Sequence, residues 1–83
     1  MPYAFLNGAF LPLADAKVGV MTHALHYGTS IFEGIRGNWN PEQQKTYVFR
    51  PREHYERFLR GCNLMRIKLE YTAEQLTDIT LDL

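Results

Sequence analysis

Two short apolar runs near the start of the chain predict a β-hairpin. They cover residues 3–6 and 9–13, and the dipeptide Asn7-Gly8 joins them. Asn-Gly suits a type I′ turn, because both central residues of that turn need positive φ. Residues 17–21 are a candidate third strand.

A second pair of strands is predicted in the middle of the chain. Residues 34–38 and 46–50 read as strands, and the residues between them include Asn, Pro, Gln and Glu. These residue types favour turns and loops. We therefore expect two strands joined by an exposed, extended loop over residues 39–45.

Helical periodicity governs the second half of the chain. Pro51 suits the first position of a helix, where its missing N–H costs nothing. From there to residue 65, apolar side chains recur at i, i+3, i+4 and i+7, which predicts a helix with one buried stripe. The predicted stripe consists of Tyr55, Phe58, Leu59, Cys62 and Met65.

A second helix is predicted from about Thr72, because Gln75 follows three residues later and completes a capping box. Leu76, Ile79 and Leu83 would give this helix one apolar face, and its period still runs at the last residue. That ending suggests a piece of a longer protein. The predicted class is α+β, with a small antiparallel sheet and two helices in one small domain over residues 1–83.

Between these patterned elements, residues 22–33 show no clean period. Residues 23–27 and 30–33 could each form a helical turn. The stretch of residues 23–36 also concentrates Tyr, Phe, Glu, Arg and two glycines. Such a segment between regular elements is typical of a site rather than of a core.

Composition and charge limit the class of protein. Hydrophobic residues make up 46% of the chain, aromatic residues 13%, and the formal net charge is zero. A disordered tail is excluded, and the total charge suggests neither nucleic acid nor an anionic membrane as a partner. Seven of the nine basic residues nevertheless lie between Lys45 and Lys68. This basic middle suits a small anionic ligand such as a phosphate, or a solvated helix face with ion pairs.

The single cysteine, Cys62, excludes an internal disulfide and fits a reducing compartment. Its place in the amphipathic run predicts a small core residue. No signal-peptide pattern is visible, and no run approaches the roughly 18 apolar residues of a membrane span. We expect a cytoplasmic, soluble protein.

Arg57 has two interpretations. Glu53 stands four residues before it, in the order that favours an exposed helical ion pair. Alternatively, a rigid helix presents the guanidinium as a planar donor fork for a phosphate. Spacing does not separate the two interpretations. Glu33 and Arg36, three residues apart, could also form a local pair.

The three histidines, His23, His26 and His54, are candidate zinc ligands, but no cysteine or carboxylate accompanies them at ligand spacing. We therefore expect no metal site, and histidines that are buried or stabilise turns.

Taken together, these residues resemble a known family. The run MTHALHYGTSIFEGIR over residues 21–36 and the run VFRPREHYERF over residues 48–58 are similar to the N-terminal domain of branched-chain amino acid aminotransferases. These enzymes belong to the fold-type IV pyridoxal-phosphate family. The likeness spans essentially the whole chain. Thr29-Ser30 stands where D-amino acid aminotransferase and aminodeoxychorismate lyase typically carry Asp-Gly, which favours the branched-chain branch.

The resemblance implies a role for five residues. Arg57 corresponds to the helical arginine that binds the cofactor phosphate. Phe32 and Gly34 correspond to positions that line the substrate side-chain pocket, and Arg36 lies beside that pocket. Tyr27 corresponds to a tyrosine that reaches the pocket of the neighbouring subunit, so a homodimer or larger homo-oligomer would complete the site.

The resemblance also implies an activity: exchange of an amino group between branched-chain L-amino acids and 2-oxoglutarate, by a ping-pong mechanism with pyridoxal phosphate. Glu33 is expected to support the site rather than react. None of Lys17, Lys45 and Lys68 matches the lysine that carries the cofactor, which in relatives lies well beyond residue 83. The 83 residues alone are therefore expected to be inactive.

Two other interpretations stay open. One is a non-enzymatic truncated module that binds a partner or a phosphate ligand. The other is a sister enzyme of the same class, such as D-amino acid aminotransferase or aminodeoxychorismate lyase.

Overall fold

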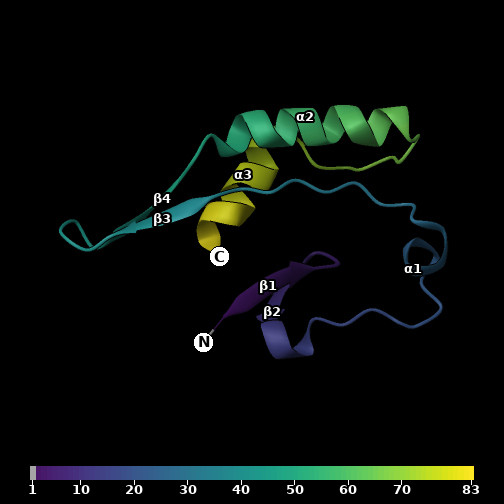
Figure 1. The fold of residues 1–83 in the computed structure, drawn as a ribbon, viewed down its shortest axis with the longest axis horizontal. Coiled ribbons are helices and arrows are strands. Elements are labelled where there is room, and N and C mark those ends of the chain that lie inside the picture. Colours follow the sequence, from purple (N-terminus) through teal and green to yellow (C-terminus); the bar gives the residue numbers. More distant parts are fainter. Residues whose placement is uncertain (1) are drawn as a thin grey trace. The chain divides into compact units, whose positions relative to one another are not determined.

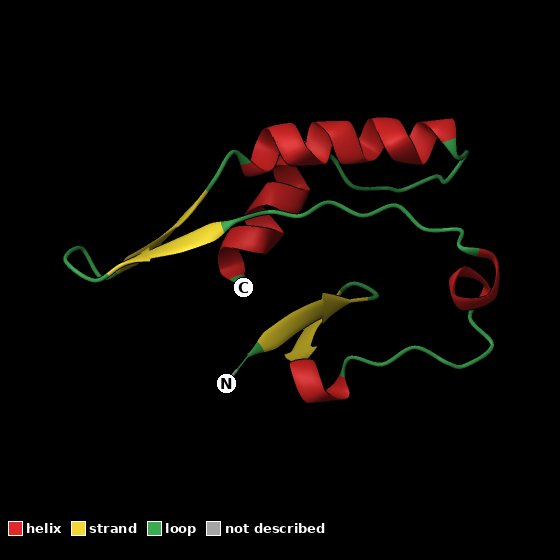
Figure 2. Cartoon of the chain, in the orientation of Figure 1, coloured by secondary structure: helices red, strands yellow, loops and turns green. Residues whose placement is uncertain are grey.

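The computed structural model describes residues 2–83 and has the α+β composition that the sequence predicts (Figure 1). Its strands form two separate two-stranded sheets, β1-β2 and β3-β4, and a short third helix, α1, adds to the two predicted helices (Figure 2). The elements are β1 (Tyr3–Leu6), β2 (Ala9–Pro12), a 3-10 turn η1 (Leu13–Asp15), α1 (His23–Tyr27), β3 (Gly37–Asn40), β4 (Lys45–Val48), α2 (Pro51–Leu64) and α3 (Ala73–Asp82).

The chain divides into two compact units. The first runs to Ser30 and includes Asp82 and Leu83, and the second covers Ile31–Leu81. Among the described residues Cys62 is the one buried hydrophobic side chain, 3% exposed, which confirms both its predicted place in the core and a thin core. No helix within residues 2–83 has the length and apolar character that crossing a membrane requires.

The first hairpin has the predicted turn. Asn7 and Gly8 have φ values of 50° and 84°, as a type I′ turn requires. The register places Phe5 opposite Phe10, and their rings meet edge to face with centroids 5.1 Å apart. This aromatic pair stabilises the register across the two strands.

Two predicted elements of the first half do not form. Residues 17–21 make no strand, because no neighbouring strand pairs with their backbone groups, and Val20 and Met21 remain 80% and 82% exposed. Residues 30–33 make no helical turn and belong to no regular element. The turn predicted over residues 23–27 is confirmed as α1. It ends at Gly28, whose φ of 66° closes the helix in the left-handed conformation.

The second hairpin lies two to three residues later than predicted at its first strand. β3 begins at Gly37 rather than at residue 34, and the loop shortens to residues 41–44. The Asn40 side chain explains the early closure, because its Oδ1 accepts hydrogen bonds from the backbone N–H groups of Glu42 and Gln43, at 3.0 and 3.2 Å. Such a turn competes with an extended loop.

The predicted first helix is confirmed as α2, with Pro51 at its first position. It ends one residue early, at Leu64, in a Schellman motif: the Ile67 N–H bonds the Cys62 carbonyl at 2.8 Å, and Arg66 adopts a left-handed φ of 57°. Met65 therefore lies at the C-cap and is 48% exposed, so it is not part of the buried stripe.

The capping box of α3 forms as predicted. The Gln75 N–H donates to Thr72 Oγ1 at 3.1 Å, and the Thr72 N–H donates to Gln75 Oε1 at 2.9 Å. A hydrogen bond between the hydroxyls of Tyr55 and Thr80 joins α2 to α3. Leu83 lies beyond the helix and is 54% exposed, so it does not extend the apolar face.

Candidate active-site segment

The extended segment of residues 31–36 runs alongside α2 in the opposite direction (Figure 1). At one end Ile31 lies against Gly61, where an added Cβ would come within 3.3 Å of Ile31 Cγ2. At the other end the Arg36 carbonyl accepts a hydrogen bond from the Phe49 N–H at 2.8 Å. Glycine at position 61 thus permits the close approach of the segment to the helix.

Side chains of this segment alternate between two environments, as they do in any extended chain. The odd-numbered residues are partly buried and form what we call the inner face: Ile31, Glu33 and Ile35. The even-numbered residues are exposed and form the outer face: Phe32, Gly34 and Arg36. The three substrate-pocket residues that the sequence predicts in this segment therefore share one face.

The inner face holds an ion-pair cluster of Glu33, Arg57 and His54. The Glu33 carboxylate accepts two hydrogen bonds from the Arg57 guanidinium, from Nε to Oε2 at 2.8 Å and from Nη2 to Oε1 at 2.6 Å. His54 Nδ1 lies 2.7 Å from the same Oε1. The Glu33 side chain is only 12% exposed, whereas that of Arg57 is 64% exposed. Arg57 is thus fixed on one side and open on the other.

The cluster holds Glu33 in its ionised form. The hydrogen bonds from Arg57 first, and from His54 second, lower the pKa of Glu33 from 4.5 to about 2. The hydrogen bond to Glu33 in turn raises the pKa of Arg57. Both partners are therefore charged at neutral pH.

Two expected local pairs are absent from the part of the chain that the structure describes. Arg57 pairs with Glu33 and not with Glu53, whose carboxylate lies 3.8 Å from Arg50 Nε instead. Glu33 accordingly does not pair with Arg36. The reason is that a bidentate contact with a partly buried carboxylate is stronger than an exposed pair along a helix.

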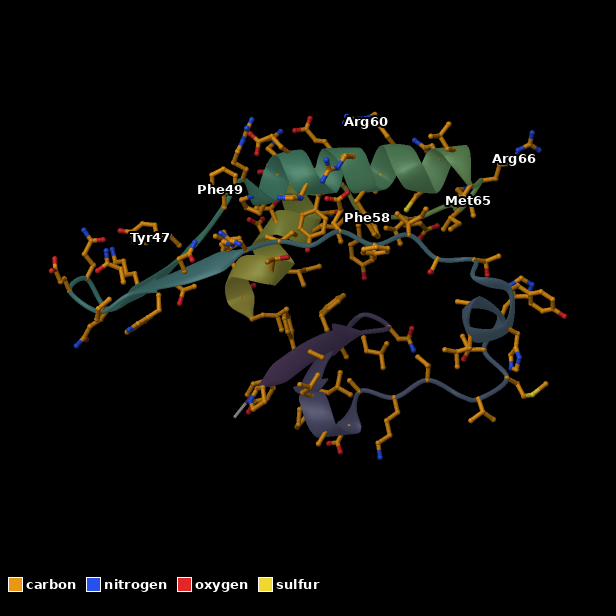
Figure 3. The ribbon with its side chains drawn as sticks, in the orientation of Figure 1. Tyr47, Phe49, Phe58, Arg60, Met65 and Arg66 are labelled. Atoms are coloured by element: carbon orange, nitrogen blue, oxygen red, sulfur yellow. The ribbon has the colours of Figure 1, made fainter. Side chains whose placement is uncertain are left out.

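A shallow depression of about 340 Å³ opens beside the cluster, over the first half of α2. Its lining combines one aromatic ring, three arginines, one histidine and one glutamate: Phe49, Arg50, Glu53, His54, Arg57 and Arg60. In Figure 3, Phe58 lies on the side of α2 toward the extended segment, and Arg60 lies on the opposite side. The excess of guanidinium groups makes the depression suited to an anion.

The structure brings four of the five predicted site residues into one unit. Phe32 is 86% exposed on the outer face, and an added Cβ at Gly34 would meet nothing within 4 Å. The Arg36 side chain is also exposed, and Arg57 lies on the adjoining helix. Tyr27 belongs to the first unit, at the last residue of α1, where its ring stacks on that of His23 with centroids 4.5 Å apart.

The three histidines have separate partners. His23 Nδ1 lies 2.7 Å from Thr29 Oγ1, and His26 Nε2 donates to the Val20 carbonyl at 2.7 Å. Both contacts stabilise turns, as expected. Across residues 2–83 no group of three His, Cys, Asp or Glu side chains could hold a metal ion.

His54 is the member of the cluster that sequence reasoning missed. It stands three residues before Arg57, so the two side chains share one face of α2. This spacing was available in the sequence. The partner that both of them meet, Glu33, was not, because it lies 21 residues before His54 and 24 before Arg57.

Comparison with known proteins supports the resemblance over the whole chain. A probable branched-chain-amino-acid aminotransferase of Aquifex aeolicus is 43% identical over 83 residues, which cover 100% of this chain and 27% of that protein. The branched-chain-amino-acid aminotransferase of Salmonella typhimurium is 40% identical over 80 residues, covering 96% of this chain and 25% of that protein. No protein-family model matches the chain.

A solved structure of a branched-chain aminotransferase is similar to this chain in both fold and sequence. The branched-chain aminotransferase from Thermoproteus uzoniensis, crystallised with norvaline, superimposes with a TM-score of 0.81 at 41% identity. The match covers 90% of this chain and 25% of that one. The chain thus spans about a quarter of the length of the relatives it matches.

Fold and sequence similarity together place the chain in the class of fold-type IV aminotransferases. Within that class the chain belongs to the branched-chain-amino-acid aminotransferase family, of which it represents the N-terminal part. The alternatives, a non-enzymatic module and a sister enzyme of the class, are not favoured.

Proposed function

We propose that this chain supplies the cofactor-phosphate side and one wall of the substrate pocket of a pyridoxal-phosphate-dependent branched-chain aminotransferase. The observation that carries the proposal is the pairing of Arg57 with Glu33 directly beneath the outer face of Phe32, Gly34 and Arg36. The full activity would be exchange of an amino group between branched-chain L-amino acids and 2-oxoglutarate.

The residues of the depression fit the phosphate of the cofactor. Glu33 engages Nε and Nη2 of Arg57, and no described residue hydrogen-bonds Nη1. That nitrogen carries two N–H donors for a phosphate oxygen. Arg50 and Arg60 line the same depression and add positive charge, which offsets the carboxylates of Glu33 and Glu53.

On the outer face, Phe32 supplies an apolar wall for a branched side chain, and Gly34 lets the ligand approach the backbone closely. Arg36 flanks this surface with a positive charge. Bound pyridoxal phosphate would supply the electron withdrawal that stabilises negative charge at the substrate Cα. Arg57 would bind and orient the phosphate, and Arg57 would not transfer a proton.

We propose further that the protein works as a homodimer or larger homo-oligomer, with Tyr27 completing the pocket of a neighbouring subunit. The exposed apolar side chains support an association. Four large aromatic side chains are at least 61% exposed, which is unusual for residues that have no partner to cover them. They are Tyr27 (73%), Phe32 (86%), Trp39 (61%) and Phe49 (61%).

The experiment compares two forms of the protein. The product of the complete reading frame should convert leucine and 2-oxoglutarate to the 2-oxo acid and glutamate when pyridoxal phosphate is present. The 83-residue chain alone should show no turnover, because none of its lysines matches the lysine that carries the cofactor. D-Alanine serves as the control substrate for a D-amino acid aminotransferase. Turnover by the chain alone, or a preference for D-alanine, would contradict the proposal.

A further inference from the structure

We infer that Glu33 is a positioning residue, which fixes the plane of the Arg57 guanidinium so that its remaining donors meet the phosphate of a phosphate-bearing cofactor. The inference rests on the proposed function. It assigns to Glu33 a role in cofactor binding, whereas its neighbours Phe32 and Gly34 are assigned to the substrate pocket. Glu33 touches neither substrate nor cofactor in this role. It acts through Arg57.

The geometry of the contact carries the argument. Two hydrogen bonds from different nitrogens, at 2.8 and 2.6 Å, fix the orientation of a planar guanidinium, whereas a single bond would leave it free to rotate. Arg57 needs such support because its side chain is 64% exposed and has many rotamers of similar energy. An arginine that is already oriented loses less entropy when an anion binds.

His54 holds the carboxylate from a second direction. Its Nδ1 lies 2.7 Å from Oε1, the oxygen that also accepts from Arg57 Nη2. Glu33 is therefore anchored by two residues of α2, and its carboxylate does not follow the motion of a single partner. This double anchor explains how a residue on an irregular segment can orient a residue on a helix.

The same contact fixes the outer face. Glu33 stands between Phe32 and Gly34 in an extended segment, so its side chain reaches α2, whereas Phe32 and Gly34 lie on the exposed face. Fixing Glu33 on the helix therefore also fixes the distance between Arg57 and the surface formed by Phe32 and Gly34. A cofactor phosphate and a substrate side chain need that constant distance.

A purely electrostatic role for Glu33 predicts the opposite sign. A carboxylate beside an anion site repels the anion, so its removal should strengthen phosphate binding. A positioning role predicts weaker binding after removal, because the guanidinium loses its orientation. Substitution of Glu33 thus separates the two roles by the direction of the change.

The test measures the dissociation constant of pyridoxal phosphate in the protein expressed from its complete reading frame, for Glu33→Gln and for Glu53→Gln. Glu53 is the matched control, because it lines the same depression but meets Arg50 only at 3.8 Å. We expect Glu33→Gln to weaken binding about tenfold, the loss of one charged hydrogen-bond contact. Glu53→Gln should strengthen binding, because it removes a carboxylate that repels the anion and is not hydrogen-bonded to Arg57. Unchanged or tighter binding by Glu33→Gln would overturn the inference.

Two further measurements make the result specific. Pyridoxal, which lacks the phosphate, should bind the wild type and Glu33→Gln equally, and a tenfold difference with pyridoxal as well would show general damage and overturn the inference. His54→Leu, which removes the Nδ1 donor at similar volume, should weaken pyridoxal phosphate binding about twofold to threefold. If Glu33→Gln does not fold, this variant decides: wild-type affinity in His54→Leu overturns the inference.

Arg57→Ala distinguishes failure of the inference from failure of the proposed function. If Arg57→Ala binds pyridoxal phosphate as tightly as the wild type, Arg57 is no phosphate ligand and the proposed function fails together with the inference. If Arg57→Ala weakens binding and Glu33→Gln does not, only the positioning role of Glu33 is wrong.

Discussion

The two faces of the 31–36 segment differ in what their residues contribute, although they alternate along one short stretch. The inner face makes the contacts that hold the segment on α2, by the packing of Ile31 against Gly61 and the ion pair of Glu33. The outer face makes few contacts of its own, and Phe32 is 86% exposed. Inner residues thus determine where outer residues stand, so a site residue can matter for binding while contributing nothing to stability.

The largest difference between the two faces is expected when one side chain on each face is truncated. Ile31→Ala should lower the free energy of unfolding by about 1–2 kcal/mol, less than a fully buried isoleucine because Ile31 is only partly buried. Phe32→Ala removes a larger side chain but should change the free energy of unfolding by less than about 0.5 kcal/mol. Urea denaturation measures both. Equal losses in the two variants would show that the faces do not differ.

Acid should weaken only the ion pair of the inner face. The resulting loss of unfolding free energy should be smaller than that of Ile31→Ala. The pKa of Glu33 is lowered from 4.5 to about 2 in the folded protein. Its contribution to stability is therefore fully present above pH 4.5 and is lost as the pH falls toward 2. The difference in unfolding free energy between wild type and Glu33→Gln should be constant above this window and shrink within it.

The pH measurement is made by urea denaturation at a series of pH values, with Glu53→Gln as the exposed control. Glu53→Gln should follow the wild-type curve through the acid range, since its contact with Arg50 is long and exposed. A Glu33→Gln difference that does not shrink on acidification would contradict the ion pair.

The smallest effect on stability is expected from an addition to the outer face. Gly34→Ala should change the free energy of unfolding by less than about 0.5 kcal/mol, because a Cβ there meets nothing within 4 Å and the backbone φ is not positive. Under the proposed function, the same methyl group in the protein from the complete reading frame should raise KM for leucine. Gly37→Ala is the matched control: its Cβ would lie 3.3 Å from Thr46 Cγ2, so it should alter stability rather than KM. A loss of stability in Gly34→Ala would show that the outer face does pack.

The elements that the sequence predicted well are those stabilised by near neighbours. The Asn7-Gly8 turn, Pro51 at the start of α2 and the Thr72–Gln75 capping box all depend on residues at most three positions apart. Such local preferences act in the same way whatever surrounds them. The predicted strand over residues 17–21 failed for the opposite reason, because a strand exists only when another strand pairs with it.

By itself the sequence determined the hairpin, both long helices, the place of Cys62 in the core and the family. Only the tertiary structure decided that Arg57 pairs with Glu33 rather than with Glu53, and that His54 joins them. Local spacing favoured Glu53, four residues away, over a carboxylate 24 residues away. A carboxylate brought close by folding, partly shielded from water and met by two donors, forms the stronger contact, and no periodicity in the sequence records that approach.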